Sequence, residues 1–213
     1  MQNCKIRFSC KVCIMKKLLS TIGLSICFVI GGLNLVFSND LKNEATPNEF
    51  TIYESNLDEW ETLAEEGNLI AQFNLANMYR EGKGVTQDYK TAVKWFTLAA
   101  DQGDAVAQYN LGIMHSFGLG VVPNYKTAVK WYRLSAEQGN QMAQYNLGRL
   151  YYLGQGVPEN FAYAYMWANQ ASSQGFDMGE ELKGLLSELM TSSQIEMAKK
   201  LEKKCFNKNF EGC

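Results

Sequence analysis

The chain has 213 residues, of which 46% are hydrophobic and 20% are charged, and its formal net charge at pH 7 is −2. This composition is typical of a globular protein with a packed core. It excludes a broad basic surface able to hold phosphates, so we expect no nucleic-acid partner.

Residues 1–38 contain basic residues and no acidic one, and they have the layout of a signal peptide. A pair of lysines precedes an uncharged run over 18–38, and small residues occupy positions −3 and −1 of a cut after Ser38. We therefore expect export to the periplasm or the exterior, with Met15 as a candidate for the true start. The alternative is an uncleaved membrane anchor through 18–38, since the run is as long as a membrane span.

Two short segments follow the signal peptide. Residues 39–48 are polar and aperiodic, which predicts a flexible linker. Residues 49–67 place apolar side chains at helical spacing and end at Gly67, so they predict a helix that caps the N-terminal end of whatever follows.

The centre of the chain is one 36-residue pattern written three times, over 68–103, 104–139 and 140–175. A unit of this length buries its apolar face only by stacking on its neighbours. Each copy has apolar stripes at helical spacing before and after a Gly-x-Gly-Val turn, and an Asn or Asp precedes each stripe as an N-cap. The pattern predicts an all-α fold, a superhelical solenoid of antiparallel helix pairs.

Small residues recur in the middle of the first helix of each copy, at Ala76, Gly112 and Gly148. A glycine there costs about 1 kcal/mol relative to alanine. We therefore expect close contact between helices at these points, with bulky Tyr and Trp side chains packed across from them.

Residues 176–213 predict C-terminal capping helices and a tail. A helix over 178–189 resembles the first helix of a fourth copy, and the sequence from Thr191 to Gln194 forms a capping box before a last helix. Terminal units of a repeat array must differ in this way, because one face of each meets water.

Cys205 and Cys213 are the two cysteines that remain after signal cleavage. An even pair in an exported chain predicts a disulfide. Because no Cys-x-x-Cys motif is present, the bond is expected to be structural.

The recurring residues resemble the Sel-1-like repeat: Ala-Gln-x-x-Leu-Gly, Gly-x-Gly-Val, Asn-Tyr-x-x-Ala-x-x-Trp and a closing Gly, as in 107–139. The resemblance implies an α/α superhelix similar to tetratricopeptide arrays, used as a scaffold for protein interaction, and kinship with secreted bacterial members. Some of those members are cysteine-rich and carry a β-lactamase label. This chain departs from them, because 68–175 contains no Cys.

The sequence offers little for catalysis, and we expect no catalytic residue, no cofactor and no metal site. Its single histidine, His115, occupies the position of Tyr79 and Tyr151 in the sister copies, which favours a packed side chain over a ligand or base. No Ser-x-x-Lys or Gly-x-Ser-x-Gly motif occurs, and the Gly-x-Gly turns lack the other residues of a phosphate loop.

Polar residues recurring on the first helices are candidates for peptide binding. An asparagine repeats at 36-residue spacing, and the residue three positions later varies, as a surface adapted to one partner would. The candidates are Asn74, Asn110, Asn146, Asn77, Ile113 and Arg149. The alternative is that each Asn ties adjacent repeats together. Neighbouring aromatics at Phe73, Tyr109 and Tyr145 belong either to a ligand surface or to the core.

The leading functional hypothesis is a non-enzymatic scaffold of the cell envelope or exterior that binds a protein or peptide in a concave groove. Two alternatives remain at this stage: a hydrolase of cell-wall or β-lactam substrates, as some family members are labelled, and a structural assembly subunit.

Overall fold

The computed structural model describes residues 28–30, 33–35 and 57–208. The chain divides into two units, 1–47 and 48–213, which are considered separately. Most of the predicted signal peptide, its cleavage site after Ser38 and the predicted linker lie outside the described residues.

The first unit contains a pair of short strands that the sequence analysis did not predict. Strands β1 (Phe28–Ile30) and β2 (Leu33–Leu35) are antiparallel, with Ile30 opposite Leu33. Two glycines separate the strands in the sequence, and a Gly-Gly pair between apolar runs is typical of a β-hairpin.

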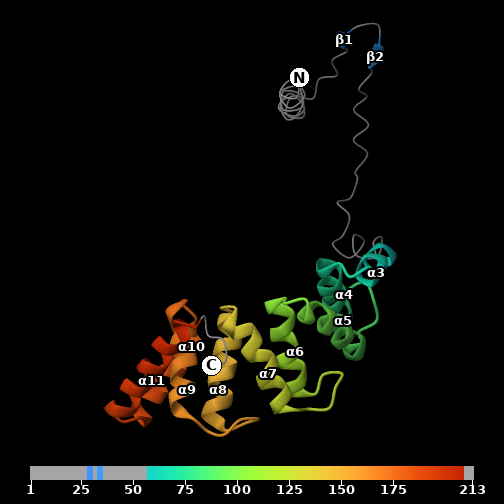
Figure 1. The fold of residues 1–213 in the computed structure, drawn as a ribbon. Coiled ribbons are helices and arrows are strands. Elements are labelled where there is room, and N and C mark those ends of the chain that lie inside the picture. Colours follow the sequence, from blue (N-terminus) through green and yellow to red (C-terminus); the bar gives the residue numbers. More distant parts are fainter. Residues whose placement is uncertain (1–27, 31–32, 36–56, 209–213) are drawn as a thin grey trace. The chain divides into compact units, whose positions relative to one another are not determined.

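The described part of the second unit consists of nine α-helices that follow one another along the array (Figure 1). They are α3 (Leu57–Glu65), α4 (Leu69–Glu81), α5 (Tyr89–Asp101), α6 (Ala105–Phe117), α7 (Tyr125–Glu137), α8 (Gln141–Leu153), α9 (Phe161–Ser173), α10 (Asp177–Leu189) and α11 (Ser192–Phe206).

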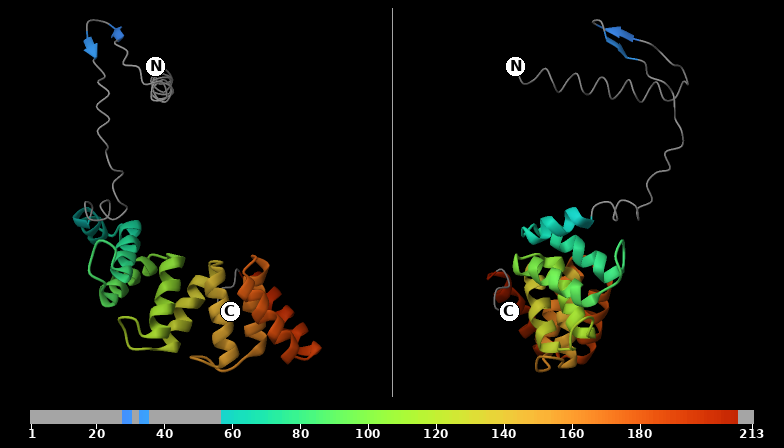
Figure 2. Two further views of the ribbon diagram at one scale, coloured as in Figure 1. Left: turned by 180° about the vertical axis from the view of Figure 1, so that it is seen from behind. Right: turned by 90° about the vertical axis from the view of Figure 1, so that its right-hand side faces the viewer.

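Each of the three copies forms the antiparallel helix pair that the sequence predicted. The pairs are α4 with α5, α6 with α7, and α8 with α9, and each second helix also packs on the next first helix. Figure 2 shows the succession of pairs from two further sides. The all-α repeat fold is therefore confirmed.

The predicted caps are also confirmed. Asn68, Asp104 and Asn140 each accept a hydrogen bond from the backbone N–H three residues later, which satisfies a donor that a helix start leaves open. The first helices of the three copies end at glycines in the left-handed conformation. Before α11, Thr191 and Gln194 form the predicted capping box.

The mid-helix glycines stand where two helices touch. A Cβ added to Gly112 would lie 2.5 Å from ring carbons of Tyr132, and one added to Gly148 would lie 3.0 Å from the carbonyl oxygen of Ala164. The close approach predicted from these glycines is therefore confirmed, and the tyrosine fills the space across from Gly112.

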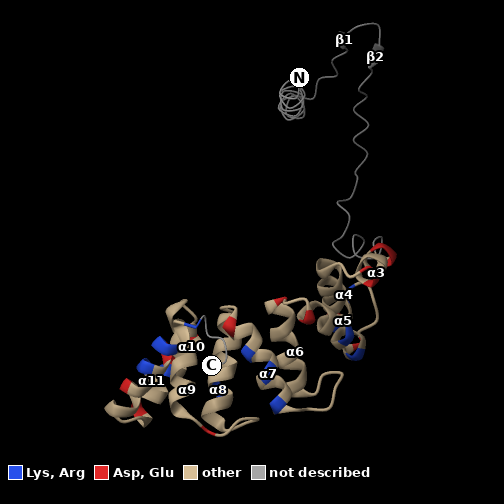
Figure 3. Ribbon diagram, in the orientation of Figure 1, with Lys and Arg blue, Asp and Glu red and all other residues tan. Residues whose placement is uncertain are grey.

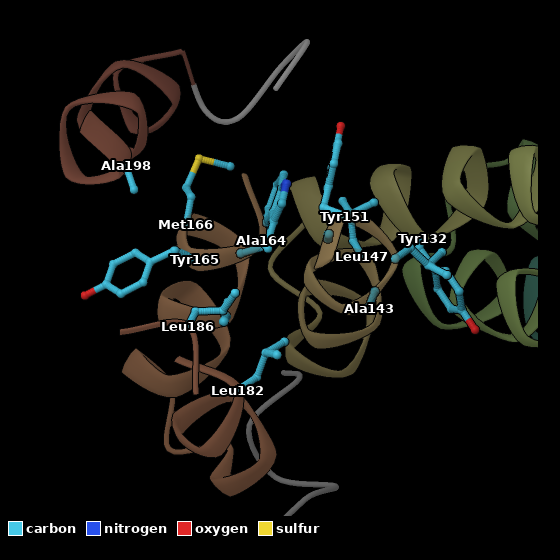
Figure 4. Packing of buried hydrophobic residues seen from close by; sticks show 14 of the residues in the cluster. Tyr132, Ala143, Leu147, Tyr151, Ala164, Tyr165, Met166, Leu182, Leu186 and Ala198 are labelled. Atoms are coloured by element: carbon cyan, nitrogen blue, oxygen red, sulfur yellow. The ribbon is translucent and has the colours of Figure 1, made fainter. Parts of the chain in front are cut away.

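The core of the C-terminal half joins α7, α8, α9, α10 and α11 (Figure 4). Helix α9 packs against α8, α10 and α11 together. Its Trp167 is fully buried, whereas the equivalent Trp131 is only half-buried. The two capping helices α10 and α11 therefore both pack on α9 at the end of the array.

Cys205 is fully buried near the end of α11. Its predicted partner, Cys213, lies outside the described residues. The pairing therefore stays a prediction.

Candidate protein-binding groove

The first helices of successive copies lie on one side of the array. Helix α6 contacts α8, and α8 contacts α10, although a second helix separates each pair in the sequence. We call the surface formed by α4, α6, α8 and α10 the first-helix face. It carries the residues that the sequence proposed for peptide binding.

A depression of about 330 Å³ lies between α8 and α10. We call it the large depression by contrast with the recess beside it; another hollow, of about 380 Å³, lies around Gln138, Gln174 and Phe206. Several of its apolar side chains are exposed, with Met178 at 47%, Leu153 at 46% and Leu185 at 41%. Its lining residues are Tyr145, Arg149, Tyr152, Leu153, Met178, Glu181, Leu182 and Leu185. Apolar side chains gathered around a hollow are typical of a surface that binds another molecule.

A smaller hollow of about 30 Å³, which we call the small recess, adjoins it through Arg149. Most of its polar lining groups are hydroxyls and amides. The lining residues are Ser116, Phe117, Tyr125, Tyr132, Asn146, Arg149 and Leu150. Burial raises the pKa of Tyr132 to about 12, so its hydroxyl stays protonated.

The three asparagines of the first helices have different environments. Asn110 is only 6% exposed, and it accepts a hydrogen bond from Nη1 of Arg80 (2.7 Å) while donating to the carbonyl of Val106 (2.9 Å). This asparagine therefore ties α6 to α4, which agrees with the structural alternative for that position. Asn74 and Asn146 are half-buried, and Asn146 donates to the carbonyl of Met142.

The variable positions follow a gradient of exposure. Asn77 and Ile113 are half-buried, and Asn77 donates to the carbonyl of Phe73 within its own helix. Arg149 is exposed and lines both hollows. Of the six candidates, Arg149 and Asn146 line the small recess and Arg149 also lines the large depression. The proposed peptide binding at these residues remains a prediction.

The three aromatic residues beside the asparagines pack on other rings. Phe73 contacts Phe96, Tyr109 contacts Tyr132, and Tyr145 contacts Phe176, with ring centroids 5.7–6.0 Å apart. They are packing residues, and Tyr145 also lines the large depression.

Buried glutamines join neighbouring helices along the array, an arrangement that was not predicted from the sequence. Gln72, Gln108 and Gln144 are each less than 5% exposed. Each donates to a carbonyl eight residues earlier, in the preceding helix, at 3.0–3.1 Å. Each also accepts from a glutamine at the end of the second helix of its own copy, at 2.7–2.8 Å. The signal was present, because both glutamines recur at 36-residue spacing.

His115 is a half-buried histidine whose Nδ1 has no hydrogen-bond partner among residues 57–208. The tyrosines at its position in the sister copies are partnered: Tyr79 donates to Glu61, and Tyr151 accepts from Arg133. Glu61 and Arg133 hold equivalent positions in the repeat, and the residue at that position before His115 is Thr97. Thr97 instead donates a hydrogen bond to a backbone carbonyl of its own helix. Burial lowers the pKa of His115 below its ordinary value of 6.5.

The pKa of His115 predicts a pH-dependent loss of stability. In the unfolded chain His115 becomes protonated near pH 6.5, whereas in the folded protein it becomes protonated only at a lower pH. The contribution of neutral His115 to the free energy of unfolding is therefore complete above pH 6.5. It decreases as the pH falls toward the pKa of His115 in the folded protein. We expect the free energy of unfolding to decrease more between pH 7 and 5 in the wild type than in His115→Tyr. Urea unfolding between pH 7 and 5 measures these free energies, and equal decreases in the wild type and in His115→Tyr would contradict the prediction.

Within 57–208 no group of three or more His, Cys, Asp or Glu side chains is placed to hold a metal ion. The described helices include none that is long and apolar enough to cross a membrane. Charges are unevenly distributed, with acidic residues on α3 and lysines on α11 (Figure 3).

Comparison with known proteins supports the repeat assignment. The sequence model of the Sel1 repeat matches residues 69–104, 105–140 and 141–176. A Sel1 repeat protein from Oxalobacter formigenes is similar in structure, with a TM-score of 0.60 and 34% identity over 63% of this chain and 55% of that one. A protective antigen of uropathogenic Escherichia coli with an SLR fold has a TM-score of 0.55 and 28% identity over 73% of this chain and 42% of that one. The matches thus span about half the length of those relatives. No curated protein sequence matches the chain.

Proposed function

Because the chain belongs to the Sel1 repeat family, whose members are generally scaffolds for protein interaction, we propose that it is a non-enzymatic scaffold. Its first-helix face binds a protein or peptide, and the binding centres on the large depression between α8 and α10. The observation that carries this proposal is the row of exposed apolar side chains around that depression.

The geometry of the depression suits a polypeptide. Leu153 and Leu185 face the hollow from opposite helices and are exposed by 46% and 41%. Burying such side chains under a partner gains about 25 cal/mol for each Å² of apolar surface removed from water. Tyr145 and Tyr152 add aromatic surface, which is enriched where binding energy concentrates.

Replacing Leu153 and Leu185 by Ser is expected to abolish or strongly weaken binding of a captured partner. Both side chains are partly exposed, so the thermal unfolding midpoint should change little. The measurement is affinity capture from an envelope extract with the full chain as bait, followed by mass spectrometry and by titration of the captured protein.

The matched control is Leu98→Ser, because Leu98 is similarly exposed at 39% but lies on the second helix α5. Capture that is lost equally in the control, or retained in the double variant, would place the interaction elsewhere. A partner that forms a fixed stoichiometric assembly would instead favour the structural-subunit alternative.

We also propose that the chain is exported and that Cys205 and Cys213 form a disulfide. The two proposals support each other, because a disulfide persists in an oxidising compartment. The support is the signal-like sequence of residues 1–38 and the even pair of cysteines after it. The bond closes a short loop and is expected to stabilise the end of α11 by about 2 to 3 kcal/mol.

Mass spectrometry of protein from the periplasm or medium, alkylated without reduction, tests both proposals at once. The expected mass corresponds to a chain that begins at Asn39 with no alkylated thiol. An intact leader in the membrane fraction would support the anchor through 18–38. Two alkylated thiols would contradict the disulfide, and a cytosolic location would contradict export.

A further inference from the structure

Arg149 is the charged residue among those that line the small recess, which lies between α6, α7 and α8. Helices α6 and α8 contain no Lys, Asp or Glu and no other Arg. Arg149 is exposed, and its guanidinium makes no hydrogen bond or ion pair with the residues that the structure describes. The other two arginines of the helical unit are engaged: Arg80 bonds Asn110 and Glu81, and Arg133 bonds Tyr151.

The small recess presents hydrogen-bond donors around this charge. Tyr132, whose hydroxyl stays protonated, lines it, and so does Tyr125 from the start of α7. No carboxylate is among its lining residues. Such a recess suits an anion, because a guanidinium binds a carboxylate through two parallel N–H bonds and is weakly hydrated when unpaired.

The large depression adds a second requirement. Its lining is mostly apolar, and its carboxylate, Glu181, comes from α10 on the side opposite Arg149. Helix α10 carries four acidic residues and one lysine. A second negative charge on the ligand would be repelled there, whereas an apolar side chain would be buried.

Resting on the proposed function, we propose that the partner segment carries one aspartate or glutamate next to a large apolar residue. The carboxylate binds Arg149 at the small recess, and the apolar side chain fills the large depression. Charge thus sets the register of the segment along the groove, and apolar burial supplies most of the affinity.

The test is selection of displayed random heptapeptides on the immobilised full chain. The wild type is expected to enrich peptides with an acidic residue beside Leu, Met or Phe. Arg149→Gln should lose the acidic preference and keep the apolar one. The matched control is Lys126→Gln, which removes the same charge from an exposed residue of α7 that lines neither hollow.

A selected peptide is then synthesised with its acidic residue and with the matching amide. We expect either Arg149→Gln or the amide peptide to weaken binding by about tenfold or more. Combining the two changes should weaken it little further, because both remove the same interaction.

The outcomes separate this inference from the function on which it rests. Selection of apolar peptides without an acidic residue, still sensitive to Leu153→Ser and Leu185→Ser, would overturn the inference and leave the proposed function standing. Peptides insensitive to those two substitutions would contradict the proposed site. Failure of the wild type to select any peptide would overturn the inference, whereas the proposed function is overturned only if affinity capture also yields no partner.

Discussion

Replacing Gly156 by Ala is expected to lower the free energy of unfolding by about 3 to 4 kcal/mol. Gly156 has a φ of +75°, where a side chain is strained. A Cβ there would also lie 2.5 Å from the carbonyl carbon of Tyr125 and 2.8 Å from the nitrogen of Lys126. Those are main-chain atoms at the start of α7, so no side-chain rotation can relieve the clash, and the third copy must move away from the second.

Gly139→Ala is the matched control for the strain alone. Gly139 has a φ of +90°, and a Cβ there would meet nothing within 4 Å. We expect this substitution to lower the free energy of unfolding by about 1 to 2 kcal/mol. Gly120 makes the same contact one copy earlier, with Tyr89, so Gly120→Ala should resemble Gly156→Ala. Urea unfolding measures all three, and equal losses for Gly139→Ala and Gly156→Ala would show that the contact between copies contributes nothing.

These glycines illustrate what the sequence can and cannot predict. The Gly-x-Gly spacing predicted a turn between the two helices of each copy, and both glycines of each turn have a positive φ. The second glycine's contact with the preceding copy could not be predicted, because it depends on how two units stack. Residue spacing predicts where each repeat begins and ends. The distance between the backbones of neighbouring copies is set only when the copies stack on one another.

The polar residues also show which features the sequence can predict and which it cannot. The asparagines were predicted to bind a peptide because a repeated amide on a helix surface could hold one. However, the side chain of Asn110 already accepts a hydrogen bond from Arg80. The glutamines recur with equal regularity, and Gln108 and Gln144 bind the preceding helix from buried positions. A 36-residue period does not distinguish a buried amide from an exposed one. A buried amide must be paired, so burial decides which of them is structural.

The large depression forms where the repeat pattern ends. The sequence predicted a helix over 178–189, and α10 confirms it. The apolar surface that Met178 and Leu185 expose toward α8 belongs to this atypical unit. Arg149 was a candidate from its variable position alone, and its place beside both hollows depends on the packing of α8 against α6, α7 and α10.

Replacing Trp167 by Ala is expected to cost about 3 to 5 kcal/mol of unfolding free energy, as for other fully buried aromatic residues. Its exposed fraction is 0%, and its helix α9 packs against α8, α10 and α11. Removing the indole leaves a cavity in the core of the C-terminal half, and close-packed interiors collapse around such a cavity only in part.

Trp131→Ala provides the comparison, because Trp131 holds the same place in the second copy but is half-buried. We expect a clearly smaller loss of unfolding free energy. Since α9 supports both walls of the large depression, Trp167→Ala should also weaken peptide binding at temperatures where the protein is still folded, whereas Trp131→Ala should leave that binding nearly unchanged. Urea unfolding and peptide titration at 10 °C separate the two variants. Equal losses of stability would mean that the fuller burial of Trp167 contributes nothing, and unchanged binding in Trp167→Ala would mean that the groove does not depend on α9.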